Sequence, residues 1–146
     1  MQTNIAEFAK NSMVKKGYNC SQAVFATFQS HLGLGNVDYD TCLKISSAFG
    51  GGIAQTGNIC GALTGALMVI GLKYGGVERK DQEKSNEVSS KFLNEFKTLN
   101  GSIICRELIE HDLVTKEDVE HAFKTGAFKN CSKFVEDASV ILKKLL

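Results

Sequence analysis

Apolar residues recur along the first third of the chain at the three- and four-residue spacing that is typical of amphipathic helices. The first apolar stripe ends at Gly17, the second is followed by Gly33 and Gly35, and the third is followed by the glycine run 50–52. The chain contains no proline, so glycine is the residue that we expect to end these helices. The stripe positions are Ile5, Phe8, Ala9, Ser12 and Met13, then Val24, Phe25, Phe28 and Leu32, and then Cys42, Ile45 and Phe49.

Two longer helices are predicted in the middle of the chain. Residues 61–74 are apolar on nearly every side, which is typical of a helix buried at the centre of a bundle. The amphipathic helix that follows ends at Asn100-Gly101, a common C-terminal signal. Its expected buried face consists of Val88, Phe92, Phe96 and Leu99.

The last third of the chain predicts two short helical pieces and one long helix. The short pieces cover residues 103–108 and 116–124, and Thr115 with Asp118 forms a capping box at the start of the second. The long helix runs from about Ser132 to the C-terminus. Because no stretch alternates apolar and polar residues as a strand does, the sequence predicts an all-α fold, a compact bundle of about five main helices with short helical pieces.

Composition and charge narrow the class of protein. The 146 residues, 43% of them hydrophobic, are enough for one core, so we expect a single domain over residues 1–146. The net charge of +1, without a basic block, predicts that the protein binds neither nucleic acid nor an anionic membrane surface. The N-terminal segment has no signal-peptide pattern, and the longest apolar run, residues 59–72, is too short to cross a membrane. These features predict a cytoplasmic protein.

The five cysteines are the residues best suited to chemistry. An odd number without any Cys-x-x-Cys pair fits neither a closed set of structural disulfides nor a zinc finger. Cys42 lies within an apolar stripe, so we interpret it as a core residue. Cys20, Cys60 and Cys131 each come at the predicted start of a helix, close to asparagine or serine residues that favour helix capping.

The start of a helix favours an ionised cysteine, because unpaired backbone N–H groups give it partial positive charge. The thiolate is the form of cysteine that attacks disulfides and binds metals. Cys105 follows the helix stop at Asn100-Gly101 and precedes Arg106, whose charge also favours a thiolate. We therefore interpret Cys20, Cys60, Cys105 and Cys131 as the candidate catalytic residues.

Glycines surround Cys60 at regular spacing. Gly57, Gly61 and Gly65 are four residues apart, which removes side chains from one helix face. One interpretation is close packing against another helix. The other is that the backbone N–H groups bind the sulfur or an anion held next to it, which makes Gly57 and Gly61 candidate cofactor-binding residues.

Four segments of the chain resemble the family of redox-active proteins named for their C_GCAxxG_C_C cysteine pattern. They are GYNCSQAVF around Cys20, FGGGIAQTGNICGALTGALMVIGLKYG around Cys60, ICREL around Cys105 and NCSKFVEDA around Cys131. Cys60 and Gly61 stand in the opposite order to the family name, and Cys42 lies outside the pattern. The resemblance implies a redox role for the four cysteines, and related domains attached to cytochromes imply an association with iron centres.

Three functions are compatible with the sequence. The first is a thiol-based oxidoreductase in which the four cysteines cycle between dithiol and disulfide with a redox partner. The second is a protein in which the same four thiolates bind an iron–sulfur cluster or another metal, with glycine N–H groups donating hydrogen bonds to the sulfurs. The third is a helical interaction module whose cysteines are only buried. The small-residue face is also compatible with a homodimer.

Overall fold

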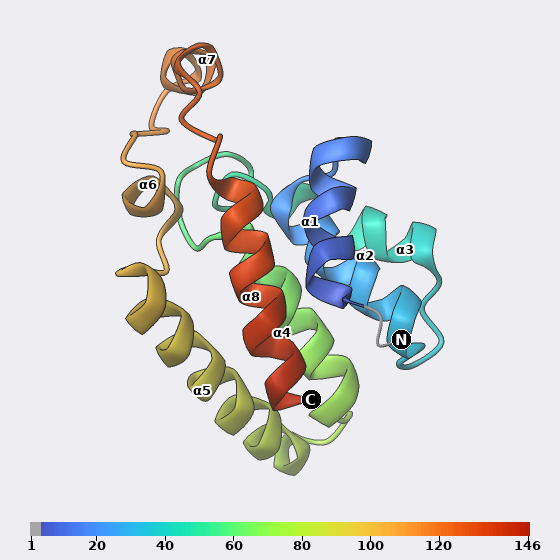
Figure 1. The fold of residues 1–146 in the computed structure, drawn as a ribbon. Coiled ribbons are helices and arrows are strands. Elements are labelled where there is room, and N and C mark those ends of the chain that lie inside the picture. The colour runs from blue at the N-terminus through green and yellow to red at the C-terminus, as the bar shows by residue number, and fades with distance from the viewer. Residues whose placement is uncertain (1–3) are drawn as a thin grey trace.

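The computed structural model describes residues 4–146 and confirms the all-α fold (Figure 1). Five helices of twelve residues or more form the bundle: α1 (Ile5–Lys16), α2 (Cys20–Leu32), α4 (Gly61–Tyr74), α5 (Gln82–Asn100) and α8 (Cys131–Leu145). The shorter elements are α3 (Tyr39–Ile45), α6 (Cys105–Leu108) and α7 (Lys116–Thr125), with two 3-10 helices, η1 (Ser47–Phe49) and η2 (Arg79–Asp81). An isolated antiparallel bridge joins Ile59 to Ile104.

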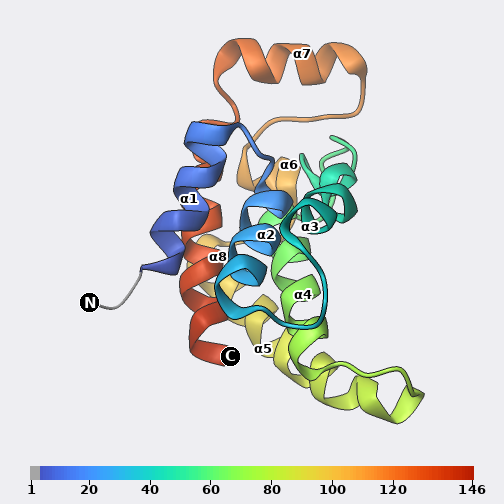
Figure 2. The ribbon, with the colours of Figure 1, turned by 90° about the vertical axis from the view of Figure 1, so that its right-hand side faces the viewer.

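Helix α4 lies at the centre of the bundle, as the sequence predicts. Helices α2, α5 and α8 all pack against it (Figures 1 and 2). Its side chains Leu63, Ala66, Val69 and Ile70 are completely buried. A helix that is apolar on nearly every side has to be enclosed in this way, because an uncovered face would leave apolar surface in water.

Helices α2 and α4 share the most extensive contact in the bundle, and glycine allows the close approach. A Cβ atom at Gly65 would lie 2.5 Å from the carbonyl oxygen of Ser21. Ser21 is fully buried, and its Oγ accepts a hydrogen bond of 3.2 Å from Thr64 Oγ1. The first turns of α2 and α4 therefore lie side by side, which confirms the interpretation of Gly65 as a packing residue.

The predicted helix ends are found with small shifts. Glycines end four helices in the left-handed conformation: Gly17, Gly33 and Gly101, as predicted, and also Gly126 at the end of α7. The third predicted helix is shorter than expected, because α3 ends at Ile45 and Phe49 belongs to η1. The Ser46 hydroxyl donates a hydrogen bond of 2.7 Å to the Cys42 carbonyl and so competes with the helical backbone at this point.

Four residues of the predicted apolar stripes are exposed. Leu32, Ile45 and Leu99 are 44%, 49% and 59% exposed, and each lies in the last turn of its helix, where no neighbouring helix covers it. Phe8 lies on the outer side of α1 and packs its ring against His31, with 5.2 Å between the ring centroids. The buried face of α5 is limited to Val88, Phe92 and Phe96.

Helices α6 and α7 belong to an arm that stands apart from the five-helix bundle (Figures 1 and 2). The arm has a small core of its own, in which Cys105, Leu113 and Ala122 are buried. The predicted capping box of Thr115 and Asp118 is present at the start of α7. The arm therefore brings Cys105 to the bundle from a separate structural unit.

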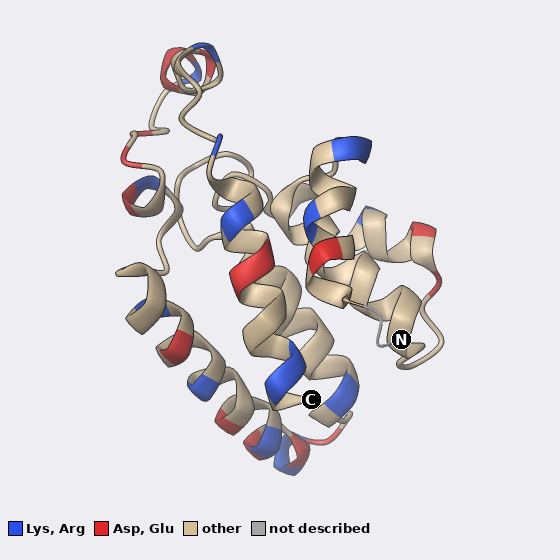
Figure 3. Cartoon of the chain, in the orientation of Figure 1, with Lys and Arg blue, Asp and Glu red and all other residues tan. Residues whose placement is uncertain are grey.

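Charged residues of both signs lie along α5 and on the outer faces of other helices, whereas the loop between η1 and α4 carries none (Figure 3). Within residues 4–146, no helix is both long enough and apolar enough to cross a membrane.

Two alanine substitutions in α4 test whether glycine spacing controls its packing on α2. We expect Gly65→Ala to lower the free energy of unfolding by about 1–3 kcal/mol, because the new methyl group meets the backbone of Ser21. Gly71→Ala is the matched control in the same helix, since a Cβ at Gly71 would have no neighbour within 4 Å. The control should raise the free energy of unfolding by about 0.5–1 kcal/mol through helix propensity alone. Urea denaturation of both variants would measure the difference, and equal effects at the two positions would contradict the packing argument.

Candidate functional site

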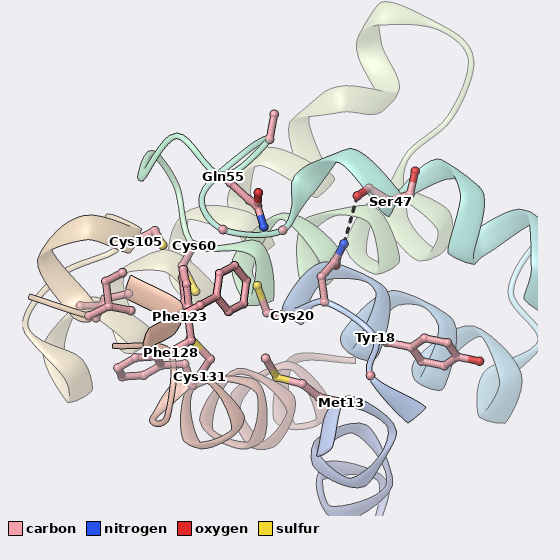
Figure 4. Close-up of a pocket in the computed structure, with 18 residues that line it drawn as sticks. Met13, Tyr18, Cys20, Ser47, Gln55, Cys60, Cys105, Phe123, Phe128 and Cys131 are labelled. Carbon is pink, nitrogen blue, oxygen red and sulfur yellow. Dashed lines mark hydrogen bonds between the residues drawn. The ribbon is translucent and has the colours of Figure 1, made fainter. Parts of the chain in front are cut away.

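Four of the five cysteines line a single cavity of about 480 Å³ (Figure 4). Each of them stands at the N-terminus of a different helix. Cys20, Cys105 and Cys131 are the first residues of α2, α6 and α8, and Cys60 is the N-cap residue of α4. The fold thus gathers the predicted set of cysteines from four distant segments of the chain.

Asn19 fixes the start of α2 and therefore the position of Cys20. Its Oδ1 accepts a hydrogen bond of 2.8 Å from the backbone N–H of Gln22, and Gln22 Oε1 accepts one of 3.0 Å from the N–H of Asn19. The Asn19 Nδ2 group also donates to the Ser47 carbonyl at 3.1 Å, which ties η1 to the same turn. The predicted capping role of asparagine is confirmed at this cysteine.

The asparagines near Cys60 and Cys131 do not cap helices through their side chains, contrary to the prediction. Asn58 lies two residues before the N-cap position of α4, and its Nδ2 donates to Thr56 Oγ1 at 2.7 Å. Asn130 occupies the N-cap position of α8 but makes no capping hydrogen bond with its side chain. The flanking asparagine therefore marks a helix start in all three cases but stabilises only one of them.

Backbone pairing holds Cys60 next to the arm. The Cys60 N–H donates to the Ile103 carbonyl at 2.9 Å, and the Cys105 N–H donates to the Asn58 carbonyl at 2.6 Å. The backbone N–H and the Nη1 group of Arg106 both donate to the Gly57 carbonyl, each at 3.1 Å. The segment before α4 and the start of α6 are therefore paired through their backbones, which holds Cys60 and Cys105 near each other.

The loop before α4 contains a left-handed turn that the sequence analysis missed. Residues 51–55 all have positive φ angles, between 52° and 73°, although Ile53, Ala54 and Gln55 are not glycines. Such a conformation costs about 1–2 kcal/mol for each residue that carries a Cβ atom. The only sequence signal for it is the glycine run 50–52, which does not predict that the turn continues into ordinary residues.

The left-handed turn has a direct role at the site, because it directs the backbone N–H of Gly51 toward the Cys20 sulfur. The neighbouring Gly52 lets the turn approach the arm: a Cβ atom there would lie 2.6 Å from the Cβ of Cys105. Strained backbone of this kind is typical of functional sites, where surrounding structure holds it in place.

Cys20 is the only thiol of the cavity whose pKa is lowered, to about 7. The largest cause is a hydrogen bond from the Cys60 thiol. Burial opposes this effect, but the backbone N–H groups of Gly51, Cys20 and Gly61 also donate to the sulfur and stabilise its negative charge. The hydrogen bonds therefore favour the thiolate form of Cys20 although the side chain is buried.

The other three thiols of the cavity are held in their neutral form. The pKa of Cys60 is well above its usual value, mainly because its proton is shared with Cys20 and also because the side chain is buried. Burial raises the pKa of Cys105 and Cys131 to about 12, and the thiolate of Cys20 adds to the effect. The expectation that every cysteine at a helix start would favour a thiolate is therefore wrong for these three. Arg106 does not change the outcome at Cys105, since its guanidinium binds the Gly57 carbonyl.

Cys42 stands outside the cavity and is completely buried in α3, as the sequence predicts for a core residue. Burial raises its pKa, and the nearby Asp38 carboxylate raises it further. The division of the cysteines into one core residue and four cavity residues thus follows from the arrangement of the helices.

The three spaced glycines have different surroundings. A Cβ atom at Gly61 would collide with the Cys20 sulfur and would lie 2.9 Å from the Phe49 carbonyl oxygen. The N–H of Gly57 donates to the Gly51 carbonyl at 3.0 Å, and Gly57 does not line the cavity. Of the two glycines considered as cofactor-binding residues, only Gly61 contacts a sulfur of the site.

The cysteines as placed do not fit the metal centre considered from the sequence. Among residues 4–146, no three cysteine, histidine, aspartate or glutamate side chains are grouped as metal ligands. His111 Nε2 and His121 Nδ1 lie 2.8 Å apart on the arm, but no third ligand joins them. A structural zinc site and an iron–sulfur cluster are each held by four protein ligands.

Comparison with known proteins gives one match. A family model described as "Putative redox-active protein (C_GCAxxG_C_C)" matches residues 18–145, which include all four cysteines of the cavity. No curated protein and no solved structure gives a match to the chain.

The pH dependence of Cys20 tests the electrostatics of the site. The thiolate is the reactive form, so alkylation of Cys20 by iodoacetamide should rise with pH and reach half of its maximum near pH 7. In Cys60→Ala the midpoint should move to higher pH, because the largest cause of the lowered pKa is removed. Mass spectrometry of labelled peptides across the pH range would measure both midpoints. A Cys20 midpoint that is the same in both proteins would contradict the assigned role of Cys60.

Gly61→Ala tests whether the glycine serves the sulfur or only the packing of helices. We expect the Cys20 midpoint to rise, because the new methyl group displaces the sulfur from the backbone N–H groups that stabilise its charge. Thiolate ultraviolet absorbance and thermal unfolding should be followed in the same samples, with Gly71→Ala as the control helix substitution. If Gly61→Ala lowers thermal stability and Cys20 still titrates as in the unchanged protein, then Gly61 is a packing residue only.

Proposed function

Because the chain belongs to the family of redox-active proteins with the C_GCAxxG_C_C pattern, we propose that Cys20 and Cys60 form a dithiol–disulfide pair. In this function the pair gives two electrons to a disulfide-bearing partner and becomes a disulfide itself. Cys20 is the attacking thiolate and Cys60 is the resolving thiol.

The observation that carries the proposal is the position of the two cysteines: both line the cavity at the first turns of α2 and α4, where a Cβ atom at Gly61, the residue after Cys60, would collide with the Cys20 sulfur. It makes the two sulfurs neighbours and at the same time gives them opposite roles, since one is ionised near neutral pH and the other keeps its proton. A thiol with a pKa near the ambient pH is also the most effective attacking group in disulfide exchange. Inert buried cysteines, by contrast, have raised pKa values, as Cys42 does.

The reaction proceeds in two exchange steps. The Cys20 thiolate attacks one sulfur of the partner's disulfide, the bond between the partner's sulfurs breaks, and one thiolate leaves. Cys60 then attacks the Cys20 sulfur, its proton passes to the departed thiolate, and the partner's second sulfur leaves as a thiolate. The protein loses two electrons to the partner, and the products are the Cys20–Cys60 disulfide and two reduced sulfur groups.

The electrostatics of the pair favour this order of events. While Cys20 is a thiolate, its charge holds the proton on Cys60. Once Cys20 is bonded to the partner's sulfur, that charge and the strong hydrogen-bond acceptor disappear, so the pKa of Cys60 falls toward its usual value. Formation of the mixed disulfide therefore activates the thiol that resolves it.

Cys105 and Cys131 have a different part in this proposal. Their pKa values of about 12 keep them protonated at neutral pH, so they do not compete with Cys20 for a disulfide. They contribute neutral, polarisable walls to the cavity on the side of the arm.

Oxidation of single-cysteine variants tests the proposal. With hydroxyethyl disulfide, an uncharged oxidant, the intact mass should fall by two hydrogen atoms, and peptide mapping should locate one Cys20–Cys60 disulfide. Cys60→Ser should accumulate a mixed disulfide on Cys20. Cys20→Ser should react at least about a hundredfold more slowly, because the remaining thiols of the cavity are protonated.

Cys42→Ser is the matched control, because its side chain lies outside the cavity, and it should oxidise as the unchanged protein does. A disulfide between any other two cysteines, or an adduct that forms first on Cys42, would contradict the proposal.

A further inference from the structure

We infer that the cavity beside Cys20 binds an uncharged aromatic disulfide of small-molecule size, which the Cys20–Cys60 pair reduces. This inference rests on the proposed function and identifies its substrate class.

The cavity contains no positive counter-charge for an anionic substrate. Among the described residues that line it there is no lysine, arginine, histidine, aspartate or glutamate. The charged residues lie elsewhere, many of them along α5 (Figure 3). A carboxylate group that entered the cavity would lose its water without gaining a partner, and this loss strongly disfavours binding. An ammonium group would find the Cys20 thiolate, but it would lose this partner as soon as the thiolate had attacked the substrate. The substrate class is therefore uncharged.

Apolar and aromatic side chains form much of the wall. They are Met13, Leu108, Ile109, Phe123, Phe128 and Phe134. A volume of about 480 Å³ falls within the range of sites for small molecules, about 300–1,000 Å³. The cavity therefore fits a molecule of one or two rings.

Phe123 gives the wall its aromatic character next to the sulfurs. It lines the same cavity as Cys60 and Cys20 (Figure 4). The residue is 62% exposed, and its ring packs against that of Phe128 with 4.8 Å between the ring centroids. A large aromatic ring exposed to water at the edge of an apolar cavity has a face free to pack on a bound ring. Because Phe123 comes from α7, the arm supplies this part of the site.

The acids next to Cys20 in the cavity are the thiols of Cys60, Cys105 and Cys131, and their raised pKa values make them weak acids. Tyr18 lines the cavity, but Figure 4 shows its hydroxyl pointing away from the sulfurs. The Asn19 amide already donates to the Ser47 carbonyl. A substrate whose leaving group is stable as an anion therefore reacts fastest, because thiolates of low pKa leave fastest in disulfide exchange. Aromatic thiols meet this requirement, which selects an aromatic disulfide.

The balanced reaction follows from the proposed function. Cys20 attacks one sulfur of the aromatic disulfide and releases one arenethiolate, and Cys60 displaces the second. The substrate gains two electrons and is converted to one arenethiol, which carries the proton of Cys60, and one arenethiolate. The protein is left with the Cys20–Cys60 disulfide, and a dithiol such as dithiothreitol restores its reduced form.

Two aromatic disulfides with the same rings, one uncharged and one carboxylated, show how the charge of the substrate affects its rate of reaction with Cys20. Dithiodipyridine is an uncharged aromatic disulfide, and dithiodinicotinate has the same two rings with one carboxylate on each. The rate with Cys20 is measured for both by the absorbance of the released thione, with Cys20→Ser as the blank. Each rate is divided by the rate of the same reagent with mercaptoethanol at the same pH.

We expect the normalised rate to be at least about tenfold higher for dithiodipyridine, because only the carboxylates lose their hydration in the cavity. Phe123→Ala should slow dithiodipyridine by about threefold to tenfold while the Cys20 pKa stays the same. Val114→Ala is the matched control, since Val114 is exposed on the same arm but does not line the cavity. It should react as the unchanged protein does.

The outcomes distinguish this inference from the function on which it rests. Equal normalised rates, or an unchanged rate in Phe123→Ala, would overturn the substrate class, while a Cys20–Cys60 disulfide formed by either reagent would still support the dithiol function. If neither reagent produces that disulfide, both are wrong.

Discussion

The close approach of α2 to α4 is the contact on which the rest of the site depends. Two positions on α4, Gly61 and Gly65, have no side chain where the first turn of α2 passes. Any larger residue there would meet either the Ser21 backbone or the Cys20 sulfur. Because the helices touch at their first turns, two cysteines forty residues apart become hydrogen-bonded neighbours.

The four cysteines illustrate that a helix N-terminus does not by itself make a thiolate. All four stand at such an end, yet only Cys20 has a lowered pKa. The difference lies in the number of donors that reach the sulfur: Cys20 receives one thiol and three backbone N–H groups, which together outweigh its burial. At Cys105 the helix is only four residues long, and burial dominates. Directed hydrogen bonds, rather than the helix dipole, therefore select the reactive cysteine.

The sequence was sufficient to predict much of the fold, because the relevant signals are local. Apolar spacing located the helices, and the capping residues around Asn19 and Thr115 marked two of their starts correctly. The opposite pKa shifts of Cys20 and Cys60 could not be predicted, since they depend on which N–H groups the tertiary packing directs at each sulfur. The left-handed turn at residues 51–55 was also out of reach, because Ile53, Ala54 and Gln55 have no preference for that conformation. Tertiary contacts hold these residues there.

The meeting of α2 and α4 at their first turns also links the redox state to the resistance of the fold to unfolding. A covalent bond between Cys20 and Cys60 would close a loop of about forty residues, and such a cross-link restricts the unfolded chain by about 4 kcal/mol. The hydrogen-bond donors around the Cys20 thiolate act in the opposite direction, because they stabilise the reduced protein. In a thermodynamic cycle, the difference in folding free energy between the disulfide form and the dithiol form sets the shift in reduction potential that folding imposes on the cysteine pair. Every residue that holds these two turns together therefore adjusts the reducing power of the protein, even if it never touches a sulfur atom.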